Sequence, residues 1–221
     1  MSRIEIKQDL RALNKQIAED NRKKFDLKGV YVINIMGSPG AGKTTFLENV
    51  LPLLCSKLRT AVIEGDLATQ NDALRIEKTG VTALQINTGG GCHLDAQMIE
   101  EQCKRLELDS LELLIIENVG NLVCPASFDL GEDMRMVILS IAEGDDKPLK
   151  YPTAFLNADT AVITKTDLAP YIDADISVMK SNIGTINPKV AVFETTKKNG
   201  SYSAHEVVDY IIGQVKKKQG R

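Results

Sequence analysis

One segment constrains this chain more than any other: a glycine-rich loop between an expected strand and an expected helix. The loop Gly37-Ser38-Pro39-Gly40-Ala41-Gly42-Lys43-Thr44 fits the pattern G-x-x-x-x-G-K-[ST]. Glycines in such a loop let backbone N–H groups turn inward on a phosphate at a helix N-terminus, where the helix dipole favours an anion. A chance match is expected in on the order of one chain in a hundred of this length. We therefore interpret the segment as a nucleotide-binding phosphate loop.

The side chains at the end of this loop have distinct expected roles. Lys43 should contact the β- and γ-phosphates, and the Thr44 hydroxyl should ligate Mg²⁺. The remaining expected nucleotide-binding positions in the loop are Gly37, Ser38, Gly40, Ala41, Gly42 and Thr45.

Strand-like and helix-like segments alternate along most of the chain. The expected strands are Val30–Met36, Thr60–Glu64, Ala83–Asn87, Leu111–Glu117, Met134–Ile141, Thr160–Thr164 and Val190–Glu194. The expected helices are Ser2–Phe25, Thr44–Leu58, Asp72–Lys78, Leu94–Leu106, Pro170–Ile183 and Ala204–Lys216. This alternation predicts an α/β fold of the P-loop NTPase type, with a doubly wound, mainly parallel seven-stranded sheet. We expect residues 1–28 to form an N-terminal helical extension and residues 29–221 to form the nucleotide-binding domain.

Composition excludes several classes of partner. The 221 residues carry a net charge of −3, so no basic field is available to attract a nucleic acid, and we expect no nucleic-acid partner. No apolar stretch approaches the roughly 18 residues of a membrane helix, and the charged N-terminus does not fit a signal peptide. Four irregularly spaced cysteines do not indicate a disulfide framework. These features favour a cytoplasmic protein without a membrane partner.

The segment Thr164-Lys165-Thr166-Asp167, which ends a strand late in the chain, suggests which base is bound. The Asp167 carboxylate can accept hydrogen bonds from N1–H and the exocyclic amine of guanine, whereas adenine would leave it unpaired. The stem of Lys165 can cover the base. The alternative is that Thr164 and Asp167 form a capping box for a following helix. We favour GTP over ATP.

Further contacts to the nucleotide are expected at other strand ends. Thr195 and Thr196 follow the last strand and are candidates for backbone contacts to guanine O6. Asp66 and Glu117 end strands at the expected ligand-binding edge of the sheet, so they are candidates for Mg²⁺ coordination or for orienting the attacking water, and Gly120 for an N–H contact to the γ-phosphate. The alternative is that these carboxylates are solvated turn residues.

Two cysteines and one histidine are expected on neighbouring loops. Cys92 and His93 follow three glycines at an expected helix start, where the helix dipole lowers a thiol pKa, and Cys124 lies in the loop after Glu117. Two thiols and an imidazole suit Zn²⁺ or Ni²⁺. Three ligands leave a position for water, substrate or a second copy of the chain, and a two-fold dimer would bring two such trios together. From spacing alone, a metal site and ordinary loop residues remain equally well supported.

For the two remaining cysteines and the second histidine we expect no metal-binding role. Cys55 and Cys103 lie in apolar helical segments and are expected to be buried and inert. His205 is expected on the surface.

Several longer segments resemble the HypB family, the nickel-incorporation GTPases of hydrogenase maturation. They are Gly37–Thr44, Glu64–Ala73, Asn87–Ala96, Glu117–Ala126 and Glu143–Asp146. The resemblance implies a GTP-hydrolysing metallochaperone that dimerises with nucleotide and passes nickel, with a nickel-delivery partner protein, toward the large subunit of [NiFe]-hydrogenase. It also implies that Cys92, His93 and Cys124 bind Ni²⁺ or Zn²⁺ at the dimer interface.

The sequence departs from the family pattern in two ways. It contains neither the N-terminal cysteine motif nor the histidine-rich store of some members, so nickel handling must rest on the nucleotide-binding domain. Thr164 also stands where the base-reading loop usually has asparagine.

A short loop joins Glu117 and Gly120 to Cys124 and suggests how two sites communicate. We hypothesise that nucleotide state changes nickel affinity through Cys124 and through dimer assembly. Unaided hydrolysis should be slow, with Arg75 or a partner residue as a candidate arginine finger. Two other functions fit the motifs: a P-loop small-molecule kinase, and a nucleotide-binding scaffold in which zinc holds a dimer together.

Overall fold

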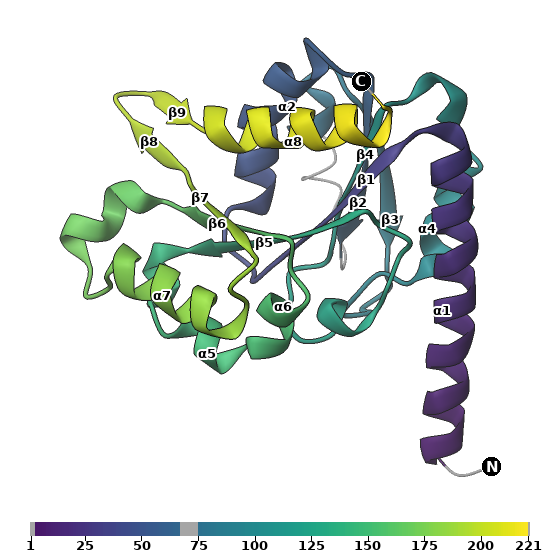
Figure 1. The fold of residues 1–221 in the computed structure, drawn as a ribbon, viewed down its shortest axis with the longest axis horizontal. Helices are drawn as coiled ribbons and strands as arrows, with labels where there is room; N and C mark the ends of the chain where they lie inside the picture. Colours follow the sequence, from purple (N-terminus) through teal and green to yellow (C-terminus); the bar gives the residue numbers. More distant parts are fainter. Residues whose placement is uncertain (1–2, 67–74, 221) are drawn as a thin grey trace.

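A computed structural model describes residues 3–66 and 75–220. Its centre is a seven-stranded sheet in which every neighbouring pair is parallel, in the order β3-β2-β4-β1-β5-β6-β7 (Figure 1). The strands are β1 Tyr31–Gly37, β2 Thr60–Asp66, β3 Thr82–Asn87, β4 Leu113–Glu117, β5 Met134–Ser140, β6 Thr160–Thr164 and β7 Ala191–Glu194. All residues of β1, β4 and β6 are buried, as expected for a parallel sheet covered on both faces. The predicted fold is confirmed.

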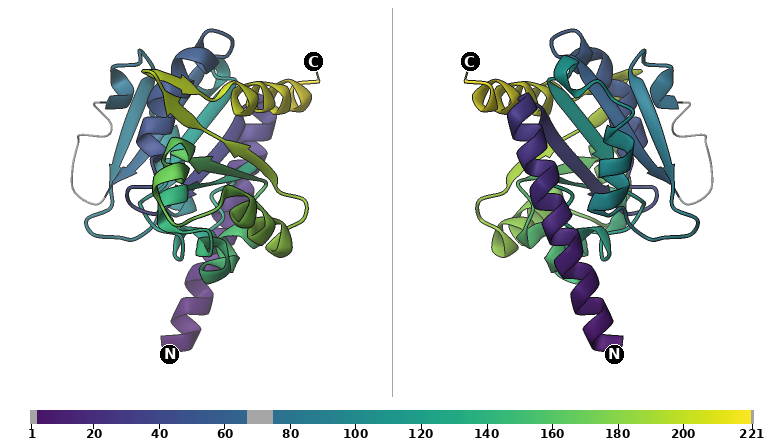
Figure 2. Two further views of the ribbon diagram at one scale, coloured as in Figure 1. Left: turned by 90° about the vertical axis from the view of Figure 1, so that its left-hand side faces the viewer. Right: turned by 90° about the vertical axis from the view of Figure 1, so that its right-hand side faces the viewer.

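Helices cover both faces of the sheet (Figures 1 and 2). The longer ones are α1 Arg3–Lys28, α2 Lys43–Cys55, α4 Ala96–Cys103, α7 Ile176–Ile186 and α8 His205–Lys218, and the short ones are α5 Lys147–Lys150 and α6 Pro152–Leu156. Alternate residues of β1 pack on opposite faces of the sheet. Ile33 and Ile35 pack with α2 and α8, whereas Val32 packs with α1 and α4. A third apolar cluster joins β5 and β6 to α6 and α7. Within the described ranges, no helix is both long and apolar enough to cross a membrane.

Several expected helix boundaries were wrong. The expected helix Leu94–Leu106 begins at Ala96, because the Asp95 carboxylate caps it by accepting a hydrogen bond from Met98. The expected helix Pro170–Ile183 is a 3₁₀ turn over Thr166–Tyr171 followed by α7, which has its own cap at Asp175. The expected helix Asp72–Lys78 falls partly on residues 67–74, outside the described ranges.

A two-stranded hairpin was not expected from the sequence. Strands β8 Thr196–Lys198 and β9 Ser201–Ser203 pair antiparallel across Asn199 and Gly200. Both turn residues have positive φ, the conformation that an Asn-Gly hairpin turn requires. The hairpin places the residues after β7 beside the 3₁₀ turn that follows β6 (Figure 1).

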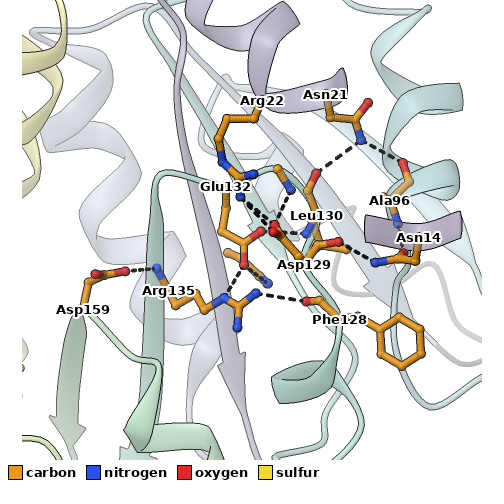
Figure 3. Close-up of polar contacts among 12 residues, drawn as sticks. Asn14, Asn21, Arg22, Ala96, Phe128, Asp129, Leu130, Glu132, Arg135 and Asp159 are labelled. Carbon is orange, nitrogen blue, oxygen red and sulfur yellow. Dashed lines mark hydrogen bonds and ion pairs between the residues drawn. The ribbon is translucent and has the colours of Figure 1, made fainter. Parts of the chain in front are cut away.

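From Asn14 onward, α1 is attached to the domain by polar contacts, while its N-terminal end extends beyond it (Figures 2 and 3). The buried Asn21 amide donates to the carbonyls of Ala96 and Leu130, at 2.9 and 3.2 Å. The Arg22 guanidinium binds both carboxylate oxygens of Asp129, at 2.7 and 3.0 Å. The segment around Asp129 is thereby fixed to both α1 and the start of α4.

Replacement of Gly131 by alanine should separate α1 from this segment. Gly131 has a φ of +92°, and an added Cβ would lie 2.7 Å from the Ala18 carbonyl oxygen and 2.8 Å from Asn21 Cβ. Backbone strain and the clash together should lower the free energy of unfolding by about 2 kcal/mol or more, measured by urea denaturation. Gly213→Ala is the matched control, because Gly213 lies in α8 with open space around it. Equal stability of the two variants would contradict the prediction.

Candidate nucleotide and metal sites

The phosphate loop connects β1 to α2 with its backbone donors available at the helix start. Gly42 adopts the left-handed conformation, with φ 94°, and caps α2 without a side-chain hydrogen bond. Lys43 and Thr44 are buried at the first turn, and Lys43 Nζ lies 3.4 Å from the Gly37 carbonyl oxygen. This arrangement presents N–H groups and one ammonium to an anion, as the motif predicts.

A cavity of about 450 Å³ opens beside this loop. The phosphate loop, the ends of β2 and β4, Arg75 and Lys165 line it. Gly120 approaches the phosphate loop so closely that an added Cβ would lie 3.1 Å from Pro39 Cγ, and the backbone of Asn121 bridges to Gly37. The loop after β4 is therefore packed directly on the phosphate loop.

Acidic side chains meet the phosphate loop at the carboxyl ends of β2 and β4. The Thr44 hydroxyl donates to Glu117 Oε1 at 2.9 Å, and Asp66 lines the same cavity. A hydroxyl and carboxylates are the oxygen donors that Mg²⁺ prefers, so these residues fit that ion. Glu64, which we did not predict as a site residue, is buried in the cavity wall and pairs with Glu117 in the strand register. Glu64 lies two residues before Asp66, so both side chains share one face of the strand, and this spacing could have indicated Glu64 as a site residue.

The base-reading segment is fastened to the phosphate loop. The Thr164 hydroxyl donates to the Ala41 carbonyl at 2.6 Å, and Lys165 Nζ donates to the Gly40 carbonyl at 2.8 Å. The hydroxyl of Thr164 therefore does not cap the following turn, and the capping-box alternative is wrong. Asp167 Oδ1 instead accepts from the Lys197 N–H at 3.1 Å.

The two expected base-binding loops lie side by side. Thr195 is buried, its hydroxyl accepts from Tyr202 Oη at 2.9 Å, and its carbonyl accepts from Thr166. The Thr196 hydroxyl lies 3.4 Å from Asp167 Oδ1. Lys165 belongs to the lining of the phosphate cavity, whereas Asp167, Thr195 and Thr196 lie beyond that lining.

The structure brings the three expected metal ligands together. The ligand atoms of Cys92, His93 and Cys124 all lie within 4.8 Å of one another. Cys92 is exposed and Cys124 is half-buried. The helix-dipole expectation for Cys92 was wrong: a hydrogen bond with the Cys124 thiol raises the Cys92 pKa, and α4 begins four residues later. Partial burial lowers the pKa of His93, which favours the neutral imidazole that binds metals.

Comparison with known proteins decides the family. The model of the CobW/HypB/UreG nucleotide-binding domain matches residues 31–194. The chain belongs to the HypB family. A hydrogenase maturation factor HypB from Azotobacter chroococcum mcd 1 is 47% identical over 197 residues, which cover 89% of this chain and 65% of that protein. This HypB-family chain thus spans about two thirds of the length of that relative.

Two solved HypB structures have the same fold as this HypB-family chain. The hydrogenase maturation factor HypB from Archaeoglobus fulgidus superposes with a TM-score of 0.85 at 39% identity, covering 92% of this chain and 99% of that chain. HypB from Helicobacter pylori in complex with nickel also gives a TM-score of 0.85, at 41% identity, covering 92% of this chain and 95% of that chain.

An aromatic ring fixes one of the three ligands in this HypB-family chain. The imidazole of His93 stacks on Phe128, with ring centroids 3.8 Å apart and an interplanar angle of 27°. Phe128 directly precedes Asp129, which is bound to α1 (Figure 3). No sequence pattern indicates this contact, because the two rings are far apart along the chain.

The two remaining cysteines, the second histidine and the candidate arginine finger lie outside the trio in this HypB-family chain. Cys55 is exposed at the last residue of α2, so the expectation that it is buried was wrong. Cys103 is buried, with its pKa raised to about 11 by desolvation, and His205 is exposed; both match expectation. Arg75 lines the cavity while its guanidinium binds both carboxylate oxygens of Glu48, at 2.6 and 2.8 Å.

Proposed function

We propose that this chain is a GTP-hydrolysing metallochaperone that binds Ni²⁺ or Zn²⁺ and assists nickel insertion into [NiFe]-hydrogenase. One observation carries the proposal: a single loop lines the phosphate cavity with Val119 and Gly120 and then supplies Cys124 to the cysteine and histidine trio. A nucleotide site and a soft-metal site joined in this way fit a carrier whose cargo binding is governed by nucleotide state.

The nucleotide would be bound by groups that already converge on the cavity. Lys43 and the loop N–H groups hold the phosphates, Thr44, Asp66 and Glu117 hold Mg²⁺, and Gly120 donates to the γ-phosphate. When bound, Mg²⁺ neutralises charge on the β- and γ-phosphate oxygens. Glu117 and Asp66 are also the candidates for orienting the attacking water, which makes the chain an enzyme that releases GDP and phosphate.

Base recognition rests on the turn after β6. Asp167 accepts from guanine N1–H and the exocyclic amine, and Lys165 covers the base. Asp167 Oδ1 already accepts from the Lys197 N–H, and the Lys165 ammonium can keep its bond to the Gly40 carbonyl while the stem of that side chain covers the base.

Nickel is the cargo of this chain, and its ligands are Cys92, His93 and Cys124. Three donors leave one position of a four-coordinate site, which a second copy of the chain supplies in a GTP-dependent homodimer. The implied partners are a nickel-delivery protein and the hydrogenase large subunit, and the implied compartment is the cytoplasm.

Phosphate release without any added acceptor tests the proposal, with GTP and ATP compared at equal concentration and Ni²⁺ binding followed by titration. We expect release from GTP, little from ATP, and one metal site per chain. ATP preference together with a requirement for an acceptor would instead favour a small-molecule kinase. If removal of the Cys92, His93 and Cys124 ligands abolished dimerisation but left nickel delivery intact, the result would favour a scaffold held together by zinc.

Asp167→Asn should weaken GTP binding by about 10²-fold, because two charge-assisted hydrogen bonds to guanine are lost. The same substitution should weaken the binding of xanthine nucleotides less, since the 2-carbonyl of xanthine accepts a hydrogen bond from the asparagine amide N–H. Isothermal titration with both nucleotides measures the two changes. Asp175→Asn is the matched control, since asparagine still caps α7 and Asp175 lies on a different turn. Unchanged GTP affinity in Asp167→Asn would remove this residue from the base site.

A further inference from the structure

The side chain of Asn118 contacts both the nucleotide cavity and the metal-binding segment. Asn118 follows β4, is 1% exposed and lies in the cavity wall. Its Oδ1 accepts from the Val119 N–H at 3.0 Å and from the Leu94 N–H at 3.1 Å. Val119 lines the cavity, and Leu94 directly follows the metal ligand His93. One oxygen atom is thus shared between the two sites.

Neighbouring groups fix the orientation of this amide. Asn118 Nδ2 donates to Asn34 Oδ1 at 3.1 Å, and Asn34 Nδ2 donates to Glu132 Oε1 at 3.3 Å. Glu132 is held in turn by Arg135 at 2.6 Å and by the Leu130 N–H at 2.7 Å (Figure 3). Because a carboxylate facing donors must accept, Asn34 and then Asn118 can each adopt one orientation. Asn118 Oδ1 is consequently directed at Leu94 and Val119.

A second, weaker contact joins the same two segments. Asn121 Nδ2 donates to the Cys92 carbonyl at 3.4 Å, and the Asn121 backbone bridges to Gly37 at the phosphate loop. The loop from Asn118 to Asn121 is therefore bonded to the phosphate loop on one side and to residues 92–94 on the other.

Resting on the proposed function, we propose that Asn118 is the positioning residue through which nucleotide state sets the geometry of His93. Contacts of the cavity-lining loop with a γ-phosphate draw the Val119 N–H away from Asn118 Oδ1. The oxygen then bonds the Leu94 N–H alone, which shifts the backbone that carries His93 relative to Cys124. After phosphate leaves, Val119 returns and the bond to Leu94 is shared again. By linkage, bound nickel changes nucleotide affinity by the same factor.

The test compares nickel affinity with GDP and with a non-hydrolysable GTP analogue, in the wild type and in Asn118→Ala. Allosteric couplings are typically about 5- to 150-fold, so we expect the wild-type affinities in the two states to differ by at least about 5-fold. In Asn118→Ala the ratio should fall to about one, while each ligand still binds by itself. A role in stability alone would not change this ratio.

Asn21→Ala is the matched control. Asn21 is also buried and also bonds the backbone at the start of α4, through Ala96, but it lies outside the cavity lining. It should lower stability and keep the wild-type ratio. The inference would be overturned if Asn118→Ala kept the wild-type ratio of nickel affinities between the two nucleotide states. It would also be overturned if Asn21→Ala lost this ratio to the same extent.

A wild-type measurement covers the case in which Asn118→Ala does not fold. Amide exchange at Leu94 should slow with the GTP analogue relative to GDP, because the hydrogen bond is then unshared; equal exchange rates would overturn the inference. If the wild type binds nickel and hydrolyses GTP but has the same nickel affinity with GDP and with the GTP analogue, the inference fails and the proposed function stands. If the wild type does neither, the proposed function itself fails, and the inference fails with it.

Discussion

Lys43→Ala is expected to lower kcat/KM for GTP hydrolysis by about 10²- to 10³-fold, the usual cost of removing one donor that stabilises charge in a transition state. Lys43 is buried at the first turn of α2, and its ammonium lies in the cavity near the Gly37 carbonyl. In that setting the charge is screened by little water, and the motif predicts that it contacts the γ-phosphate. Steady-state phosphate release measures the loss.

Lys218→Ala is the control for this prediction. The Lys218 ammonium is also largely buried and binds Asp26 and Asp133 at 2.8 Å, but it lies in α8, outside the cavity lining. Its loss should reduce stability and leave kcat/KM unchanged. If Lys43→Ala kept more than about a tenth of the wild-type kcat/KM, the phosphate-contact role of Lys43 would be refuted.

Cys124→Ala is expected to weaken Ni²⁺ binding by about 10²-fold or more. Loss of groups that merely support a metal ligand costs 10- to 100-fold, and Cys124 is one of the three proposed direct ligands. Competition with a chelator of known affinity, under reducing conditions, gives the dissociation constant. Loss of thiolate-to-metal charge-transfer absorption should accompany the change.

Cys55→Ala separates ligand loss from general thiol chemistry. Cys55 is exposed at the end of α2 and lies outside the trio. It should leave the nickel dissociation constant unchanged. Equal weakening in the two variants would show that the titration reports adventitious thiol binding and not a site at Cys124.

The features predicted correctly depend on short-range patterns or on one topological rule. The phosphate loop is contiguous, and its strand and helix flank it directly. Asp66 and Glu117 could be expected at one edge because parallel strands end there together. The trio followed from the same rule, since Cys92 and Cys124 lie in loops after β3 and β4.

The features that were missed depend on contacts between distant segments. The stacking of His93 on Phe128 and the bond from Asn118 to Asn34 join residues with no common sequence pattern. Cys55 has an apolar helical context, but its position at the last residue of α2 exposes it. The hairpin was different, because its Asn199-Gly200 turn is a recognisable local signal in the sequence.

The bonds from Thr164 to Ala41 and from Lys165 to Gly40 have a thermodynamic consequence. They hold the carbonyls of the phosphate loop through β6 and the turn that follows it, so the loop is already ordered before ligand arrives. Little conformational entropy remains to be lost there on binding. Inorganic pyrophosphate, which has no base, should therefore meet a cradle that is already stiffened before a base adds any contact.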